Sequence, residues 1–128
     1  MNPYYDRSNL SRIPDLMALS PRAAAAYLSF EKEIYQSSEV LPPLTKELIA
    51  VAVAHVTGCP YCIDVHVQKG KALGGTREEI FEAVLVAAST RAGAVLSHAT
   101  HALSAFEEPE DPPSPKPSGG QSPPDCFC

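Results

Sequence analysis

Apolar residues recur every three or four positions through most of this chain, and glycine and proline interrupt the pattern at a few points. This spacing is that of one helix face, whereas the strict alternation of a half-buried strand is weak throughout. Ser20-Pro21 is typical of a helix start, and the residues that follow on one face are Ala23, Tyr27, Phe30 and Ile34. The sequence therefore predicts an all-α fold, a compact bundle of about five to six helices.

The interruptions divide the chain into further helices. A second helix is expected over residues 45–57, and because it is apolar nearly all round we expect it to be the most buried element. Gly58 ends it. A third helix is expected with Cys59 as its N-cap and Pro60 at the first helical position, continuing to about Leu73.

Gly74-Gly75 close the third helix, and Thr76 with Glu79 forms a capping box that opens a fourth. Three of its residues should face the interior: Ile80, Val84 and Ala87. We expect a separate last helix, softened near its start by Gly93. It carries one apolar stripe made of Ala92, Val95, Ala99, Leu103 and Phe106.

The composition changes abruptly near Phe106. Residues 107–128 hold 7 of the 13 prolines and few apolar residues. Such a segment cannot bury enough apolar surface to offset the entropy lost on ordering. We therefore predict one helical domain over residues 1–106 and a disordered, Pro-rich acidic tail over residues 107–128.

The charge balance limits the possible partners. Acidic residues outnumber basic residues 15 to 10, and no Lys/Arg cluster is present, so a nucleic-acid partner is not expected. The first residues do not resemble a signal peptide, and the apolar run over residues 49–54 is far too short to span a bilayer. We expect a soluble, cytoplasmic protein with no membrane partner.

Four cysteines occur as two close pairs, Cys59–Cys62 and Cys126–Cys128. In a reducing cytosol a close pair is more often catalytic or metal-binding than structural. The thiolate is the reactive form of cysteine, and a helix N-terminus lowers the pKa of a thiol. Cys59 and Cys62 are three residues apart at the expected start of a helix, which indicates a reversible dithiol.

Two further residues bear on this pair. His66 follows Cys62 by four residues and so lies one turn along the same face, where it is placed to take a proton from a thiol. Glu47 lies in the first turn of the preceding helix. Antiparallel packing places Glu47 toward the far end of the third helix from the cysteines, and sequence reasoning does not decide whether it reaches His66.

Metal binding is an alternative for these residues. Cys59 and Cys62 are half of a possible zinc site, completed by Cys126 and Cys128 or by His66 and one more ligand. The position of the pair at a helix start favours redox chemistry instead. His98 and His101 are spaced for a metal site with a carboxylate, but one buried and one exposed histidine is the preferred interpretation.

The combined pattern is that of a known family. Glu47, eleven residues, Cys59-Pro60-Tyr61-Cys62, three residues and His66 resemble the E…C-x-x-C-x-x-x-H motif of the alkylhydroperoxidase D and carboxymuconolactone decarboxylase superfamily. The similarity extends over residues 41–103. The first six residues, with Cys-Pro-Tyr-Cys-Ile-Asp, resemble a peroxidase-like subgroup associated with arsenosugar biosynthesis.

The resemblance implies a compact helical domain assembled as a homotrimer or homohexamer. It implies Cys62 as the peroxidatic thiolate, Cys59 as the resolving thiol, and Glu47 in contact with His66 as a proton relay. The predicted thiol chemistry requires no metal and no organic cofactor. Tyr61 stands where some peroxidase-active members carry histidine, and we interpret it as a wall of the pocket.

The function predicted on these grounds is a thiol-dependent peroxidase or disulfide oxidoreductase. Its partners are a hydroperoxide substrate and an external dithiol reductant, such as a lipoyl- or thioredoxin-like protein. Two alternatives stay open. One is a decarboxylase-like lyase on the same fold, and the other is a non-catalytic thiol module that binds zinc or arsenite or senses oxidants.

Overall fold

The computed structural model describes residues 5–110, and every ordered element in this part of the chain is helical. The elements are η1 (Arg7–Arg12), α1 (Ile13–Ala18), α2 (Pro21–Lys32), η2 (Glu33–Ser37), α3 (Pro43–Thr57), α4 (Pro60–Ala72) and α5 (Arg77–Glu107). The predicted all-α fold is confirmed. The expectations for most of the tail, including Cys126 and Cys128, lie outside the described residues.

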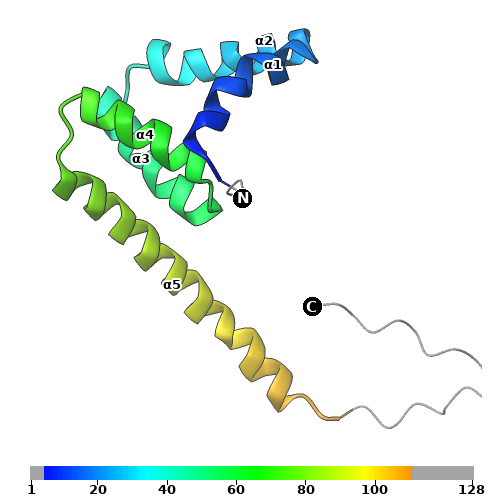
Figure 1. Cartoon of the computed structure of the whole chain (residues 1–128). Helices are drawn as coiled ribbons and strands as arrows, with labels where there is room; N and C mark the ends of the chain where they lie inside the picture. Colours follow the sequence, from blue (N-terminus) through cyan, green and yellow to red (C-terminus); the bar gives the residue numbers. More distant parts are fainter. Residues whose placement is uncertain (1–4, 111–128) are drawn as a thin grey trace, which may run out of the picture.

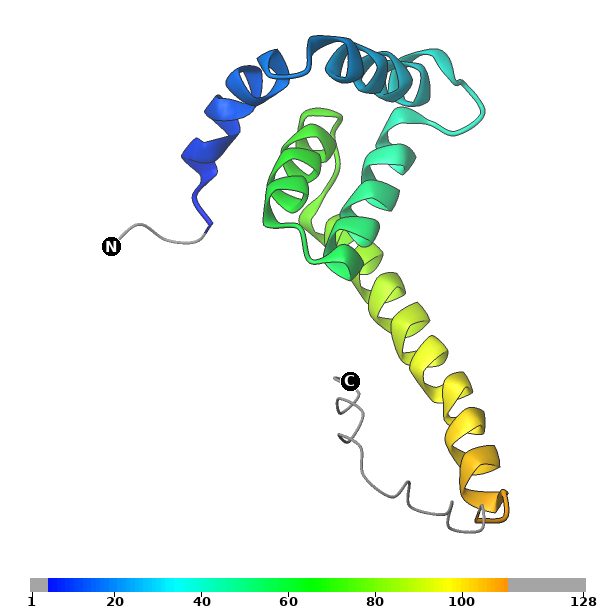
Figure 2. The same cartoon turned by 90° about the vertical axis from the view of Figure 1, so that its right-hand side faces the viewer.

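Helices α3 and α4 form a hairpin that packs beside the first half of α5 (Figures 1 and 2). Gly58 makes the reversal possible, because its φ of 69° lies in the left-handed region that favours glycine. The backbone N–H of Cys59 then donates to the Ala54 carbonyl, which closes the end of α3. The predicted end of α3 is therefore confirmed, while its start lies at Pro43, two residues earlier than expected.

The core of the described chain is small. Its buried apolar residues are Val51, Ala54 and Ala87, and α3, which also buries Glu47, is the most buried element, as predicted. One face of α3 is nonetheless half exposed, at Ile49, Val53 and Val56. The apolar face predicted for α2 is exposed as well, with Phe30 65% accessible.

The predicted division of the last segment into two helices is wrong. The capping box of Thr76 and Glu79 is present, but the helix that it opens runs without a break from Arg77 to Glu107. Gly93 does not end it, because a single glycine costs only about 1 kcal/mol relative to alanine in a helix. The flanking alanines, Ala92 and Ala94, favour its continuation.

The second half of α5 extends beyond the hairpin (Figure 1), and every residue from Ala88 to Glu110 is exposed. By length and composition alone α5 is apolar enough to cross a membrane, and almost none of that apolar stretch is buried. Core helices of soluble proteins are often as long and as apolar, so this finding does not make α5 a membrane span. The exposed half carries large apolar side chains, such as Val95, Leu96 and Leu103.

The elements η1, α1 and η2 were not foreseen from the sequence. Asp6 caps η1 by accepting hydrogen bonds from the backbone and side chain of Ser8. Helix α2 continues into η2, whose π-helical turn is closed by a hydrogen bond from the Ser38 N–H to the Glu33 carbonyl. Together, η1, α1, α2 and η2 lie along one side of the α3–α4 hairpin (Figure 2).

The surroundings of Gly75 and Gly93 predict opposite effects of alanine substitution on the free energy of unfolding. A Cβ at Gly75 would lie 2.8 Å from the Gly70 carbonyl oxygen and 2.9 Å from Leu44, whereas a Cβ at Gly93 meets nothing within 4 Å. We expect Gly75→Ala to lower the free energy of unfolding by about 1–3 kcal/mol through this clash. Gly93→Ala should raise it by about 0.5–1 kcal/mol. Urea unfolding at one protein concentration tests both, and equal midpoints for the two variants would contradict the packing described.

Candidate functional site

The cysteine pair lies at the start of α4, with Cys59 at the N-cap and Pro60 in the first turn, as predicted. The Cys59 sulfur accepts a hydrogen bond from the Cys62 backbone N–H at 3.3 Å. The two Sγ atoms are 2.7 Å apart, so the two thiols share a hydrogen bond. Both thiols are free and reachable by solvent. A disulfide between them therefore needs little backbone movement.

The hydrogen bonds make the two thiols unequal. The thiol of Cys62 and the backbone N–H groups of Cys62 and Tyr61 lower the pKa of Cys59, because they favour its anion. The hydrogen bond with Cys59, together with partial desolvation and the charge of Cys59, raises the pKa of Cys62 to about 11. In this resting arrangement the first negative charge therefore lies on Cys59. The family resemblance had implied Cys62 as the thiolate.

Glu47 and His66 meet across the α3–α4 hairpin. Their Oε2 and Nδ1 atoms are 2.7 Å apart, and both side chains are largely buried. The contact that sequence reasoning left open is therefore made. It is possible because α4 approaches α3 closely at Gly70, where an added Cβ would lie 3.8 Å from the Cβ of Glu47.

This contact fixes how His66 can act. With a proton on Nδ1 the imidazole donates to the Glu47 carboxylate, and Nε2 is then an acceptor. In the described residues no hydrogen bond joins His66 to either sulfur, so any proton transfer between them runs through a substrate or a water.

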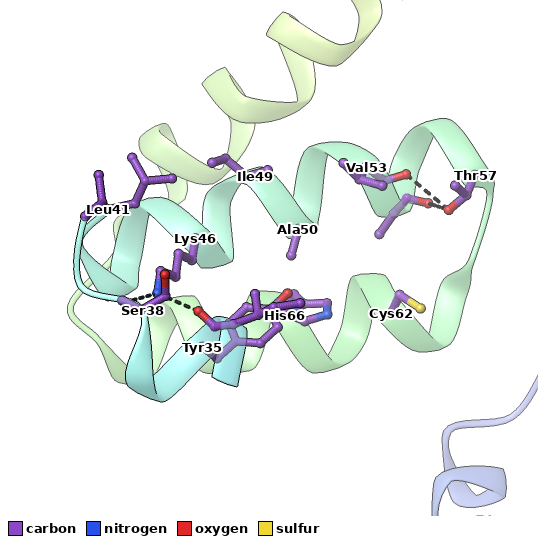
Figure 3. A pocket seen from close by; sticks show the side chains of 13 residues that line it. Tyr35, Ser38, Leu41, Lys46, Ile49, Ala50, Val53, Thr57, Cys62 and His66 are labelled. Carbon is purple, nitrogen blue, oxygen red and sulfur yellow. Dashed lines mark hydrogen bonds between the residues drawn. The ribbon is translucent and has the colours of Figure 1, made fainter. Parts of the chain in front are cut away.

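Cys62 and His66 open into a cavity of about 570 Å³ (Figure 3). One face of α3 forms a continuous wall through Lys46, Ile49, Ala50, Val53, Ala54 and Thr57, spaced as one helical stripe. The segment from Ile34 to Leu41 closes another side. The lining is mostly apolar, with Cys62 and Thr57 at one end and Lys46 at the other (Figure 3).

Tyr35 is a site residue that sequence reasoning missed. Its ring stacks on His66 with the centroids 5.7 Å apart and the planes 24° from parallel. Tyr35 lies in the π-helical turn η2, directly after the apolar face predicted for the first long helix. Nothing in the local sequence marks this turn, so the contact follows only from the packing of η2 against α3 and α4.

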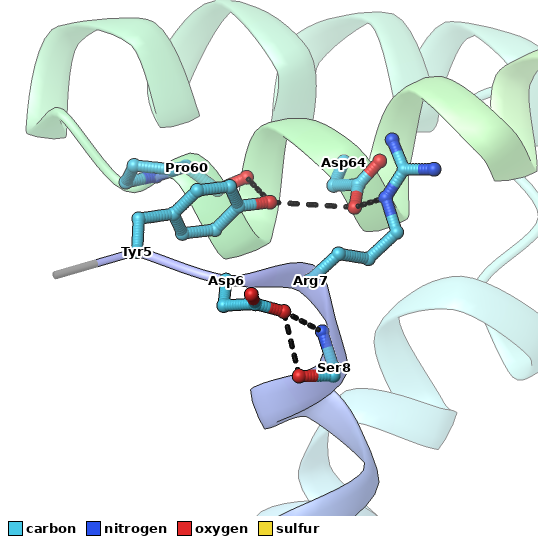
Figure 4. Close-up of polar contacts among 6 residues, drawn as sticks. All are labelled: Tyr5, Asp6, Arg7, Ser8, Pro60 and Asp64. Carbon is cyan, nitrogen blue, oxygen red and sulfur yellow. Dashed lines mark hydrogen bonds and ion pairs between the residues drawn. The ribbon is translucent and has the colours of Figure 1, made fainter. Parts of the chain in front are cut away.

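Tyr61, expected as a pocket wall, does not line this cavity. Its hydroxyl accepts a hydrogen bond from Asn9, and its ring lies 4.7 Å from that of Tyr5. Close by, Tyr5 and Arg7 both bond to the Asp64 carboxylate (Figure 4). The N-terminal segment therefore holds the outer side of the first turns of α4, and Tyr61 belongs to that contact.

The described residues provide no complete set of metal ligands, and the zinc site completed by Cys126 and Cys128 lies outside them. Within residues 5–110, no three side chains of the His, Cys, Asp or Glu types gather as a metal site requires. His98 and His101 are both exposed, with ring centroids 5.6 Å apart, so the expectation of one buried and one exposed histidine is wrong. The reason is that the whole second half of α5 is exposed, and no element of the described chain covers either ring.

The chain is similar in sequence to one protein family and to several bacterial proteins. The model of the carboxymuconolactone decarboxylase family matches residues 21–105. An uncharacterized protein of the cox locus of Paracoccus denitrificans is 48% identical over 83 residues, which are 65% of this chain and 74% of that protein. An uncharacterized Cupriavidus necator protein is 32% identical over 87 residues, 68% of this chain and 76% of the relative. Neither name states an activity.

The unequal thiols predict a two-step titration. In a Cys126→Ser/Cys128→Ser background, thiolate absorbance should rise in two separated steps, the second near pH 11. Cys59→Ser should move the Cys62 step to lower pH, because it removes the sulfur anion that holds the Cys62 proton. Cys62→Ser should leave a single acidic step. A single unshifted step in the Cys59/Cys62 dithiol protein would contradict the hydrogen-bonded pair.

Proposed function

Because the chain belongs to the carboxymuconolactone decarboxylase family and places a dithiol beside a buried Glu–His pair, we propose that it is a thiol-dependent peroxidase. The observation that carries the proposal is that Cys62 and His66 line one cavity, while Cys59 lies in contact with Cys62 and Glu47 with His66. The chemistry requires a nucleophile, a resolving thiol and a proton relay. This group of four residues supplies each.

The proposed cycle begins with proton transfer from Cys62 to the Cys59 thiolate over their 2.7 Å contact. The Cys62 thiolate attacks the terminal oxygen of a hydroperoxide, ROOH, and the O–O bond breaks. Cys62 becomes a sulfenic acid, and the alkoxide leaves as ROH by taking, through His66, the proton that Cys59 released when it ionised. Cys59 then attacks the Cys62 sulfur, and a disulfide and water form. Two thiols and ROOH thus give a disulfide, ROH and H₂O.

An external dithiol completes the cycle. Both sulfurs are accessible at the open start of α4, so a small or protein-bound dithiol can attack the disulfide and restore the pair. A lipoyl- or thioredoxin-like protein meets this need. We place the reaction in the cytosol, where such reductants are available and a close cysteine pair stays reduced.

The cavity indicates which hydroperoxides fit. Its walls are largely apolar side chains such as Ile49, Val53 and Leu41, and its volume of about 570 Å³ exceeds what hydrogen peroxide needs. Burial of an apolar substituent contributes binding energy that hydrogen peroxide lacks. The proposal therefore concerns organic hydroperoxides in particular.

The activity prediction uses peroxide consumption with a dithiol reductant. Cys62→Ser should abolish turnover, and His66→Gln, which keeps a donor for Glu47, should lower kcat/KM by about 10²–10⁴-fold. His98→Gln, on the exposed half of α5, is the matched control and should keep wild-type activity. The wild type should prefer cumene hydroperoxide to hydrogen peroxide.

Two outcomes would contradict this mechanism. Full activity in Cys62→Ser would exclude Cys62 as the nucleophile. Equal activity in Cys59→Ser and the wild type over many turnovers, with no intramolecular disulfide found by mass spectrometry, would exclude Cys59 as the resolving thiol. Folding of each variant is checked by its far-ultraviolet circular dichroism.

We also propose that the protein acts as a homotrimer or homohexamer. Large apolar side chains are exposed on α2, on one face of α3 and along α5, more than a stable monomer usually leaves uncovered. Sedimentation velocity at micromolar concentration should show a species of three or six chains. Leu96→Glu, in the middle of the exposed half of α5, should shift it toward smaller species, and a stable wild-type monomer would contradict the proposal.

One alternative keeps support from the family match, whose description names a decarboxylase. A lyase of this kind does not need the dithiol. Turnover of a lactone acid by a Cys59→Ser/Cys62→Ser variant would favour it over the peroxidase. A thiol module that binds zinc or arsenite would instead show stoichiometric metal that blocks thiol labelling.

A further inference from the structure

The π-helical turn η2 lies directly over the Glu–His pair. Its hydrogen bond from Ser38 back to Glu33 spans five residues, one more than in an α-helix. Such turns are uncommon, and they recur at functional sites because the extra residue redirects a side chain. Here the residue at the middle of the turn is Tyr35, and its half-buried ring forms an offset stack with His66.

Tyr35 constrains the imidazole of His66 in a way that its hydrogen bond to Glu47 does not. The bond at Nδ1 holds one edge of the imidazole, but a single bond leaves the ring free to tilt about it, because the terminal torsion of histidine is broad. A ring stacked on the imidazole face removes that freedom. Lys69 approaches the same tyrosine ring, with its ammonium 5.7 Å from the centroid.

Lys46 fixes the turn itself. Its ammonium donates to the carbonyls of Ile34, at 2.6 Å, and Ser38, which lie on either side of Tyr35 in the chain (Figure 3). Lys46 is the residue before Glu47 on α3. Two adjacent residues of α3 therefore fix the two stacked rings. Lys46 binds the turn that carries Tyr35, and Glu47 binds His66.

We propose that Tyr35 is a positioning residue that fixes the ring plane of His66, and that Lys46 acts through Tyr35 by anchoring η2 to α3. The stack keeps the second ring nitrogen of His66 in register with the cavity that Cys62 shares. Neither residue takes part in bond making. The effect on thiol chemistry rests on the proposed function, whereas the effect on the His66 ring does not.

The test compares ring variants with a matched control. Tyr35→Leu removes the stack, Tyr35→Phe keeps it, and Phe30→Leu changes an exposed aromatic residue of α2 that does not line the cavity. The ring nitrogen chemical shifts of His66 should move in Tyr35→Leu only. In a Cys59→Ser/Cys126→Ser/Cys128→Ser background, where Cys62 is the one remaining thiol, its alkylation by iodoacetamide should slow about tenfold in Tyr35→Leu, the scale of a small misplacement.

Lys46 is tested through a double variant. Lys46→Met should shift the His66 nitrogens as Tyr35→Leu does, and the double variant should add nothing further, while Lys32→Met on α2 serves as the control. Full additivity would overturn the route through Tyr35. An unchanged His66 spectrum in Tyr35→Leu, or an equal change in Tyr35→Phe, would overturn the role of the stacked ring. His66 shifts that move as expected in a protein without peroxidase activity would support this inference and count against the proposed function alone.

Discussion

The contact between Glu47 and His66 is the interaction on which the rest of the structure depends. Glu47 is the one buried charged side chain among the described residues, and its carboxylate is stabilised there by the imidazole 2.7 Å away. Removing one partner of a buried pair costs about 3–5 kcal/mol, because a charge stays buried without compensation. The close approach of α3 and α4 at Gly70 and the pairing of these two side chains are therefore two aspects of one constraint.

The properties of the dithiol depend on a different feature, the N-terminus of α4. Cys59 can serve as an N-cap only because its sulfur accepts the N–H of Cys62, and this same bond lowers its pKa. The hydrogen bond between the two thiols raises the pKa of Cys62. Cys59 therefore loses its proton before Cys62 does, and an acidic Cys59 is compatible with an attacking Cys62. A proton that moves from Cys62 to Cys59 over their 2.7 Å contact transfers the negative charge to Cys62.

The sequence predicted most of what local rules control. Gly58, the Cys59-Pro60 start and the capping box at Thr76 and Glu79 act within one turn of the chain, and each prediction was correct in the structure. The predictions that were wrong or missing concern features that depend on packing between distant segments or on weak local preferences. Gly93 alone could not show that α5 continues, and the π-helical turn carrying Tyr35 has no local signature. The spacing of Glu47 and His66 likewise left their contact undecided until the crossing of α3 and α4 was known.

The two halves of the site differ in rigidity for a physical reason. The Glu47–His66 pair lies where the chain is best packed, beside Val51 and Gly70, so its geometry costs no reorganisation when a proton moves. The dithiol lies at an accessible helix start, where one sulfur must meet a substrate and later the pair must meet a second dithiol. A buried disulfide would be protected from its reductant, and an exposed imidazole would lose the partner that orients it. The hairpin of α3 and α4 meets both demands because its interior holds the relay and its open end holds the sulfurs.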